Sequence, residues 1–221
     1  MSLRRTIFAA TYDRMSRKSE EAGLRALRQS LLAEAAGSVL EIGGGTGANV
    51  GLYSPAIESL VVTEPEPAML RRLERAAREH APAPTVLRAA AEDLPFQDNS
   101  FDTVVSTLVL CGVDDQVRAL REARRVLRPG GRLLFLEHVR ADDPGLARLQ
   151  DRMNWLNRLV VHCDCNRPTL ATIEGEGFAV SRLERTTFPK APKFVSPLIL
   201  GAAVCEHASQ PAPAASLHRG A

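Results

Sequence analysis

A glycine-rich turn at the end of the first predicted strand constrains this chain more than any other feature. Val39–Ile42 is a short apolar run that contains one acid, Glu41, and four of the next five residues, Gly43–Gly47, are glycine. Glycine has no Cβ and adopts a positive φ at little cost, so such a turn lets the backbone approach a ligand closely. We therefore expect a nucleotide-like cofactor to bind at this turn.

Short apolar runs alternate with helical patterns along the rest of the chain. Strands that alternate with helices predict a parallel sheet with helices on both faces. A helix is expected directly after the glycine turn. The predicted later strands are 60–63, 85–87, 101–106, 132–137, 178–186 and 198–204, and the other predicted helices are 19–35, 66–79, 116–127, 145–161 and 168–176.

Length and composition indicate one folded unit. The 221 residues are 45% hydrophobic and 24% charged, which suits a single compact α/β domain over residues 1–205. Residues 206–221 are rich in Ala, Pro and Ser, and we expect a disordered tail there. The net charge is only +2 and the basic residues are mixed with acids along predicted helices, so no nucleic-acid partner is expected.

The cysteines and the N-terminal segment bear on the cellular compartment. Four cysteines, at positions 111, 163, 165 and 205, lack zinc-like spacing with histidines, so we expect reduced thiols and no metal. The first residues include two arginines without an apolar run behind them, and no stretch of about 18 apolar residues occurs. These observations predict a cytoplasmic protein without a membrane span.

Two kinds of cofactor fit the glycine turn taken alone. Gly43, Gly45 and Ala48 also satisfy a dinucleotide fingerprint, and Glu64 lies near the expected distance of about 20 residues downstream. Glu41, however, suits a cationic amine and would repel a pyrophosphate. No Tyr-x-x-x-Lys pairing typical of dehydrogenases occurs. A nucleotide-dependent oxidoreductase is therefore the more distant alternative.

Four segments, in order, carry a resemblance to a known family. LEIGGGTG, TEPEPAML, AEDLPFQDNSFD and RVLRPGGRLLFLEH are similar to segments of the class I S-adenosylmethionine-dependent methyltransferases of the small-molecule "type 11" kind. The resemblance covers roughly residues 8–205. It implies a Rossmann-like, doubly wound sheet of six parallel strands and one antiparallel strand, the last, with S-adenosylmethionine across the carboxyl ends. Residues 1–36 would form lid helices, and 140–176 would be helices inserted on the substrate side.

The resemblance also implies cofactor contacts, position by position. The methionine half would lie by Thr107 and the glycine loop, and the ribose hydroxyls would be accepted by Glu64, because a carboxylate offers two acceptors and no donor. Ala90 stands where relatives often have Asp, so recognition of the adenine amino group shifts toward Glu92. The implied cofactor-binding residues are Glu41, Gly43, Gly45, Gly47, Glu64, Pro65, Met69, Ala91, Glu92 and Thr107.

The acceptor is expected to be a small molecule. No Asn/Asp-Pro-Pro-Tyr/Phe motif of amide methylation follows the fourth strand, where the chain reads STLVLCGV. This segment, EHV at 137–139 and DCNR at 164–167 resemble a branch that methylates alkyl thiols, although Arg167-Pro168-Thr169 replaces Leu-Thr-Arg. A C- or O-methyltransferase of a quinone, phenol or polyketide is the alternative. A non-catalytic S-adenosylmethionine-binding scaffold is an alternative of another class.

Several residues are candidates for the acceptor side. A thiol with a pKa of about 8–9 is partly ionised at neutral pH, and His138, at the end of the fifth strand, is the candidate base. Asp164 either orients His138 or caps the following helix. Each of these residues also has a purely structural interpretation. The substrate-binding candidates are Tyr12, as part of the lid, Cys111, Trp155 and Asn166.

Overall fold

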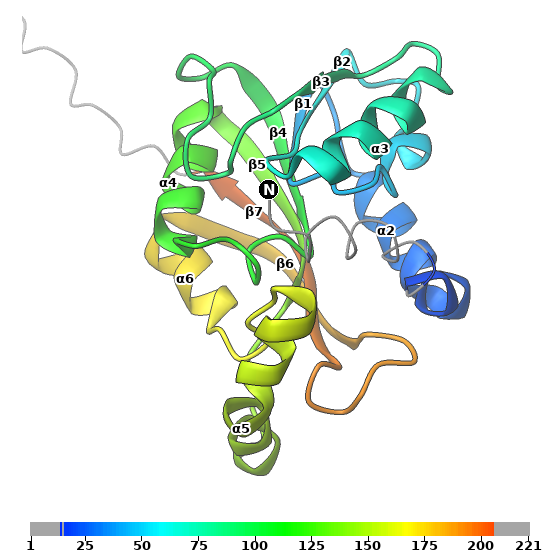
Figure 1. The fold of residues 1–221 in the computed structure, drawn as a ribbon. Coiled ribbons are helices and arrows are strands. Elements are labelled where there is room, and N and C mark those ends of the chain that lie inside the picture. Colours follow the sequence, from blue (N-terminus) through cyan, green and yellow to red (C-terminus); the bar gives the residue numbers. More distant parts are fainter. Residues whose placement is uncertain (1–13, 15, 206–221) are drawn as a thin grey trace, which may run out of the picture.

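One seven-stranded sheet forms the centre of the molecule. The computed structural model of the chain describes residue 14 and residues 16–205. The strand order is β3-β2-β1-β4-β5-β7-β6 (Figure 1). Strands β1 to β5 are parallel and β7 is antiparallel to both its neighbours, so the predicted sheet of six parallel strands and one antiparallel strand is confirmed. The strands are β1 Ser38–Ile42, β2 Ser59–Thr63, β3 Thr85–Leu87, β4 Phe101–Thr107, β5 Leu127–His138, β6 Phe178–Thr187 and β7 Pro197–Cys205.

Helices cover both faces of the sheet. Helices α4 and α6 pack on one face, and α2 and α3 pack on the other (Figure 1). Two separate apolar cores result, one between each helical layer and the sheet, as expected for a doubly wound fold. The helices are η1 Glu20–Leu24, α2 Arg25–Leu32, α3 Pro67–Arg78, α4 Gln116–Val126, α5 Pro144–Val161 and α6 Thr169–Gly175, with a 3₁₀ turn, η2, at Val50–Leu52.

Strand β5 shows why the central strands read as continuous apolar runs. Leu134 and Leu136 belong to the core beneath α2, whereas Leu133 and Phe135 belong to the core beneath α4 and α6. Successive side chains of a strand point to opposite faces, and here both faces are covered. All four side chains are therefore fully buried.

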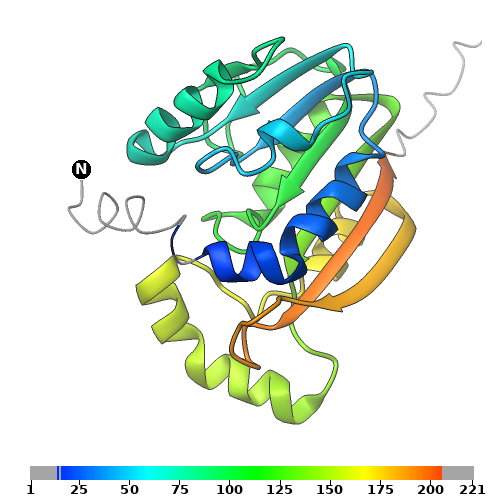
Figure 2. The same cartoon turned by 90° about the vertical axis from the view of Figure 1, so that its right-hand side faces the viewer.

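Helix α5 lies beyond the sheet at the end of the molecule reached by β5 (Figures 1 and 2). Its first turn is capped by Asp143, whose Oδ1 accepts from the Leu146 amide at 2.7 Å. His162 ends the helix in a left-handed conformation, with φ 55°. Buried Gln150 anchors the helix, because its Nε2 donates to the carbonyls of Val139 at 3.1 Å and Cys165 at 2.8 Å.

Three local predictions differ from the structure. The helix expected directly after the glycine turn is replaced by turns and η2, since Asn49 uses its side chain inside the core and glycine at positions 47 and 51 disfavours helix. The helix predicted over 19–35 is interrupted at Gly23, whose φ is 134°. Strand β5 begins at Leu127, which pairs with Phe101 ahead of a bulge.

Two predicted segments fall partly or wholly outside the described part of the chain. The expected lid helices, 1–36, are described only at residue 14 and from residue 16 onward, and the expected tail, 206–221, lies wholly outside. The expected insertion over 140–176 contains α5 and α6.

The strand order creates the position for a site. Strand β1 lies between β2 and β4, so the chain leaves β1 toward one side and β4 toward the other. Loops that follow these strands therefore diverge at the carboxyl edge of the sheet. In open α/β sheets this switch point leaves a crevice in which ligands bind.

The close contact at Gly201 gives a prediction about stability. A Cβ on this β7 residue would lie 2.3 Å from the Arg182 carbonyl oxygen and 2.6 Å from Cζ of Phe135. Gly201→Ala should therefore lower the free energy of unfolding by roughly 1–3 kcal/mol, measured by urea denaturation. Gly175→Ala is the control, because its Cβ would meet nothing within 4 Å. Equal stability of the two variants would contradict this account.

Candidate active site

A cavity of about 540 Å³ opens at the carboxyl edge of the sheet, within the range of about 300–1,000 Å³ typical of small-molecule sites. It is lined by the loops after β1, β2, β3 and β4, by one residue of α2, and by the end of α5 with the loop that follows it. The lining residues are Arg28, Glu41, Gly43, Gly44, Gly45, Thr46, Ala48, Asn49, Glu64, Pro65, Glu66, Met69, Ala90, Ala91, Glu92, Thr107, Leu108, Val109, Gly112, Val113, Asp114, Arg158, Val161, His162, Asp164 and Arg167.

The glycine loop has a backbone that requires glycine. Gly43, Gly45 and Gly47 have φ values of 61°, 58° and 93°. A Cβ on Gly43 would lie 2.7 Å from the Val109 side chain, whereas a Cβ on Gly45 would meet nothing within 4 Å. Gly43 and Gly45 line the cavity, and Gly47 instead packs against Ala76. The loop thus presents bare backbone to a ligand at Gly45.

Glu64, just after β2, holds the glycine loop by a direct hydrogen bond. Its Oε2 accepts from the Gly45 amide and its Oε1 accepts from the Glu66 amide, both at 2.9 Å. Burial raises the pKa of this carboxyl group, and the two amides oppose the shift. Each oxygen retains a lone pair, so the carboxylate can still accept from hydroxyl groups of a ligand. Pro65 follows it in the cavity wall.

Glu41 lies at the end of β1 and is 2% exposed. Its Oε1 accepts from Asn49 Nδ2 at 3.0 Å, and its Oε2 accepts from the Tyr53 hydroxyl at 2.7 Å. Burial raises the pKa of Glu41, and it raises the pKa of Tyr53 well above its ordinary value as well. The residue lines the cavity, as its predicted contact with a cationic amine requires.

Arg28 of α2 extends the network around Glu41. It is 3% exposed, and its Nη1 donates to Asn49 Oδ1 and to Thr107 Oγ1, each at 3.0 Å. Its Nε donates to Glu20 at 3.1 Å. Thr107, a predicted cofactor contact, therefore lines the cavity as part of a buried hydrogen-bond network.

The loops after β2 and β3 form the far end of the cavity. Met69 and Ala91 are 7% and 5% exposed and give this end an apolar wall. Glu92 also lines it, but its Oε1 accepts from the amides of Asp114 at 2.8 Å and Asp115 at 3.3 Å. The predicted shift of adenine recognition to Glu92 would thus use an acid that already holds the loop before α4.

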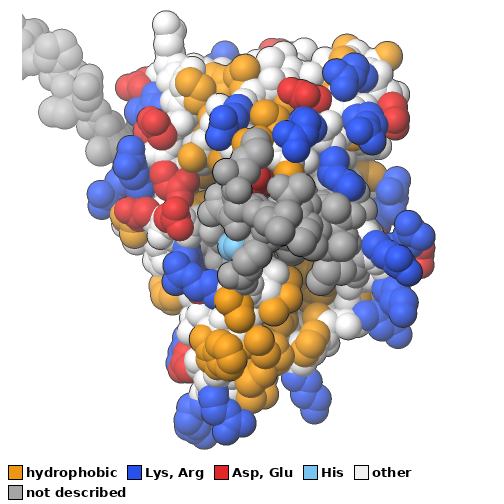
Figure 3. Space-filling view, in the orientation of Figure 1, with side chains coloured by type: hydrophobic (Ala, Val, Ile, Leu, Met, Phe, Trp, Pro, Cys, Tyr) orange, Lys and Arg blue, Asp and Glu red, His pale blue; other side chains and the backbone are white. Residues whose placement is uncertain are grey.

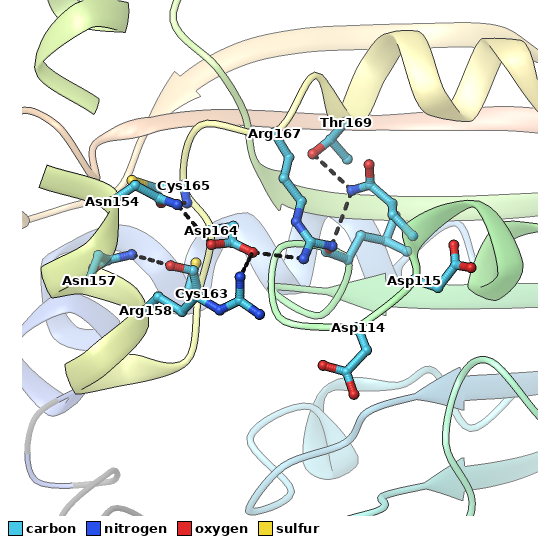
Figure 4. A network of polar contacts seen from close by, with 12 residues as sticks. Asp114, Asp115, Asn154, Asn157, Arg158, Cys163, Asp164, Cys165, Arg167 and Thr169 are labelled. Carbon is cyan, nitrogen blue, oxygen red and sulfur yellow. Dashed lines mark hydrogen bonds and ion pairs between the residues drawn. The ribbon is translucent and has the colours of Figure 1, made fainter. Parts of the chain in front are cut away.

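The opposite end of the cavity has a cluster of charged side chains from α5 and the loop after it (Figure 4). Asp164 Oδ2 accepts from Arg167 Nη2 at 2.8 Å, and its Oδ1 accepts from Asn154 Nδ2 at 2.8 Å. Arg158 Nη1 lies 3.8 Å from the same Oδ2. Although burial acts to raise it, these donors hold the pKa of Asp164 below its ordinary value. The carboxylate is therefore ionised at neutral pH.

His138 lies outside the cavity lining, contrary to the expectation that it faces the acceptor. Its position on β5 is in phase with Leu134 and Leu136, so the ring turns toward the face of α2, where it stacks on Phe188 with ring centroids 5.3 Å apart. Burial lowers its pKa to about 4. Asp164 does not orient it, since that carboxylate holds Arg167, Asn154 and Arg158. An imidazole of this pKa is a weak base for a thiol.

Three of the substrate-binding candidates, Cys111, Trp155 and Asn166, do not line the cavity either. Cys111 is 2% exposed and packs with Cys163 and Cys165. Asn166 Nδ2 donates to Asp151 Oδ1 at 2.9 Å. Tyr12 lies outside the described residues.

Trp155 lies on the outer surface of α5. It is 67% exposed, and Leu159 and Val160 on the same helix are 47% and 51% exposed. Apolar side chains gather at this lower end of the molecule in the space-filling view (Figure 3). Trp155 is therefore neither a core residue nor part of the cavity wall.

Sequence reasoning missed several residues of the cavity wall. Arg28 had a usable signal, because it follows Leu24 by one turn and precedes Leu31 and Leu32 by one turn, on the apolar face of α2. Asn49 had a weaker signal as a polar residue that follows the glycine loop. The charged side chains of α5 and the loop after it had no usable signal, since their meeting depends on the path of the chain between α5 and α6. The missed polar residues include Arg28, Asn49, Arg158, His162 and Arg167.

Two negative findings apply to the described part of the chain. Within residues 14 and 16–205, no group of three or more His, Cys, Asp or Glu side chains is placed to hold a metal ion. Over the same residues, no helix has both the length and the apolar character needed to cross a membrane.

The fold and the cavity define a class I S-adenosylmethionine-dependent methyltransferase. The residues fit this cofactor: open space at Gly45 admits it, Glu64 retains acceptors for ribose hydroxyls, and Met69 and Ala91 supply an apolar wall for adenine. The family description "Methyltransferase domain" matches residues 40–135. Solved structures agree in fold, among them the YcgJ protein from Bacillus subtilis, with TM-score 0.68 and 20% identity, covering 85% of this chain and 100% of that chain.

Relatives narrow the family further. The thiol S-methyltransferase TMT1A of Homo sapiens is 35% identical over 182 residues, covering 76% of this chain and 70% of that protein. The ubiquinone/menaquinone biosynthesis C-methyltransferase UbiE of Hahella chejuensis is 38% identical over 122 residues, covering 53% of this chain and 49% of that protein. The chain belongs to the methyltransferase family that includes the thiol S-methyltransferases TMT1A and TMT1B.

The two hydrogen bonds of Glu64 give a prediction about cofactor affinity. In Glu64→Gln, one of the two backbone amides faces an NH₂ group instead of an oxygen, and a ribose hydroxyl loses a charged acceptor. We expect the affinity for S-adenosylhomocysteine, measured by calorimetry, to fall roughly tenfold or more. Glu79→Gln, an equal change of charge on an exposed residue at the end of α3, should leave the affinity unchanged.

The depressed pKa of His138 gives a prediction about stability and pH. The imidazole stays neutral in the folded state down to pH of about 4 but takes up a proton in the unfolded chain below its ordinary pKa of 6.5. The unfolded state therefore binds more protons in this window, and stability falls as pH falls. Between pH 7 and pH 5, His138→Phe should lose about 2 kcal/mol less unfolding free energy than the unmodified protein.

The matched variant for this experiment is His80→Gln, which changes an exposed histidine at the end of α3. It should keep the pH dependence of the unmodified protein. If His138→Phe keeps it too, the buried imidazole is not its source.

Proposed function

We propose that this methyltransferase transfers the methyl group to the sulfur of a small-molecule thiol. The proposal is supported by the thiol S-methyltransferases at 35% identity, whose alignments cover 76% of this chain. Bound S-adenosylmethionine supplies a methyl group on a positively charged sulfur, and its transfer to a thiolate gives a thioether.

The observation that carries the proposal is the pair of guanidinium groups at the acceptor end of the cavity. Arg158 and Arg167 both line it, and both lie beside Asp164. They make this end of the cavity favourable for an anionic acceptor, and the nucleophilic form of a thiol, the thiolate, is itself an anion. A thiol with a pKa of about 8–9 needs only a modest shift to be ionised at neutral pH.

A thiol of this pKa can react without a strong general base. His138 is buried with a pKa of about 4 and does not line the cavity. His162 does line it, at the end of α5. The role of His138 as base, the cytoplasmic location, and the oxidation state of the cysteines stay predictions.

A C-methyltransferase of quinones is the alternative that the UbiE relatives favour. Their alignments, however, cover about half of this chain, 53% for the Hahella chejuensis protein. Methylation of a quinol carbon requires the loss of the ring proton that the methyl group replaces, and a base would serve this better than two guanidinium groups. Activity on quinols would therefore argue for a different acceptor arrangement.

A methyl-transfer screen tests the proposal. The purified chain is incubated with labelled S-adenosylmethionine and matched sets of alkyl thiols, phenols and quinols, and the products are separated and counted. We expect labelled thioethers from thiols, with rates that rise with pH as the free thiol ionises. Activity on phenols or quinols with inert thiols would overturn the thiol assignment while leaving the methyl donor in place.

A further inference from the structure

At the acceptor end of the cavity, some charged side chains are hydrogen-bonded within the described part of the protein and one is not. Asp164 is committed to Arg167 at 2.8 Å and to Asn154 at 2.8 Å. Arg167 is committed in turn, because its Nη1 donates to the Leu110 carbonyl at 3.1 Å. The charges of Arg167 and Asp164 therefore offset one another, and both side chains are held in place (Figure 4).

The guanidinium of Arg158 has no such hydrogen bonds within the described residues. Its Nη1 lies 3.8 Å from Asp164 Oδ2, which is beyond hydrogen-bond distance, and its side chain is 67% exposed. Among the described residues its guanidinium makes no hydrogen bond, so its donors are available to a ligand. Asp114 is an exposed acid that also lines the cavity, and it stands apart from the two arginines in Figure 4.

Apolar side chains also line the cavity, on the loop after β4 and on α5. Val109, Val113 and Val161 line the cavity together with Leu108. These side chains suit a hydrocarbon body and offer no polar group to it. A ligand that fills this end would thus contact apolar walls along its length and a guanidinium at its outer end.

We propose that the methyl acceptor is a small organic anion, with an apolar body against Val109, Val113 and Val161 and a carboxylate or similar oxyanion paired with Arg158. The inference rests on the proposed thiol activity for the accepting atom, but the anionic group is a separate property of the ligand. The planar guanidinium donates two parallel hydrogen bonds to a carboxylate, which fixes the orientation of the acceptor. Asp164 positions Arg158 by attraction without using its donors.

Matched acceptors test the charge directly. Mercaptohexanoate and mercaptohexanol share a thiol and a chain and differ in the far group, an anion or a hydroxyl. We expect the chain to prefer mercaptohexanoate roughly tenfold in kcat/KM at low salt. The preference should shrink as salt is added, because the pair is exposed to solvent. It should be lost in Arg158→Gln and kept in Arg152→Gln, an exposed arginine of the same helix outside the cavity.

A binding measurement separates this inference from the proposed activity. Hexanoate and hexanol, which carry no thiol, are titrated into protein saturated with S-adenosylhomocysteine. We expect hexanoate to bind more tightly, and this difference to vanish in Arg158→Gln, even if no thiol is methylated. Equal binding of the two ligands, or a preference for hexanoate that survives Arg158→Gln, would overturn the anionic acceptor whatever the reaction is.

Discussion

The side-chain amide of Asn49 joins three parts of the chain that are distant in sequence. Its Nδ2 donates to Glu41 at the end of β1 and to Thr107 at the end of β4, while its Oδ1 accepts from Arg28 of α2. These groups are buried, so a missing partner would leave a polar atom without water or a hydrogen bond. The glycine loop, the two central strands and the helix that covers them are thus held in one arrangement.

The strands could be predicted because burial on both faces requires apolar side chains at successive positions, which appear in the sequence as continuous apolar runs. Thr85–Leu87 has the same bounds in the sequence prediction and in the structure, and the other strand predictions differ from the structure mainly at their ends. The candidate cofactor half of the cavity could be predicted for a related reason. Glu41 lies near the end of β1 and Glu64 directly follows β2, and the carboxyl ends of parallel strands meet at one edge of the sheet. The same reasoning failed for His138. A one-residue difference in phase along β5 decides which face a side chain occupies, and the sequence placed both Glu137 and His138 at the strand end.

The part of the cavity formed by α5 and the loop after it could not be predicted in this way. Asp164, Arg158 and Arg167 meet because α5 extends beyond the sheet and the chain then returns toward α6, a path that no periodic pattern encodes. The family match over residues 40–135 ends before this region begins. Methyltransferases with different acceptors therefore share the first half, and the acceptor of a given chain has to be argued from its own side chains after β5.

The burial of carboxylates at this edge of the sheet lowers the stability of the folded state, and a bound ligand can offset this loss. Burial raises the pKa of Glu41, Glu64 and Glu137, so each of these groups takes up protons more readily when folded, and its contribution to stability falls as pH rises through the shifted value. Glu137 is fully buried, and its Oε2 has no hydrogen-bond partner among the described residues. A core that only had to fold would hold apolar side chains here. Glu41 and Glu64 line the cavity, where a cationic or hydroxyl-bearing ligand would stabilise their ionised forms, and Glu137 accepts from the amide of Val109 in the cavity wall. Binding of such a ligand would therefore raise the stability of the fold.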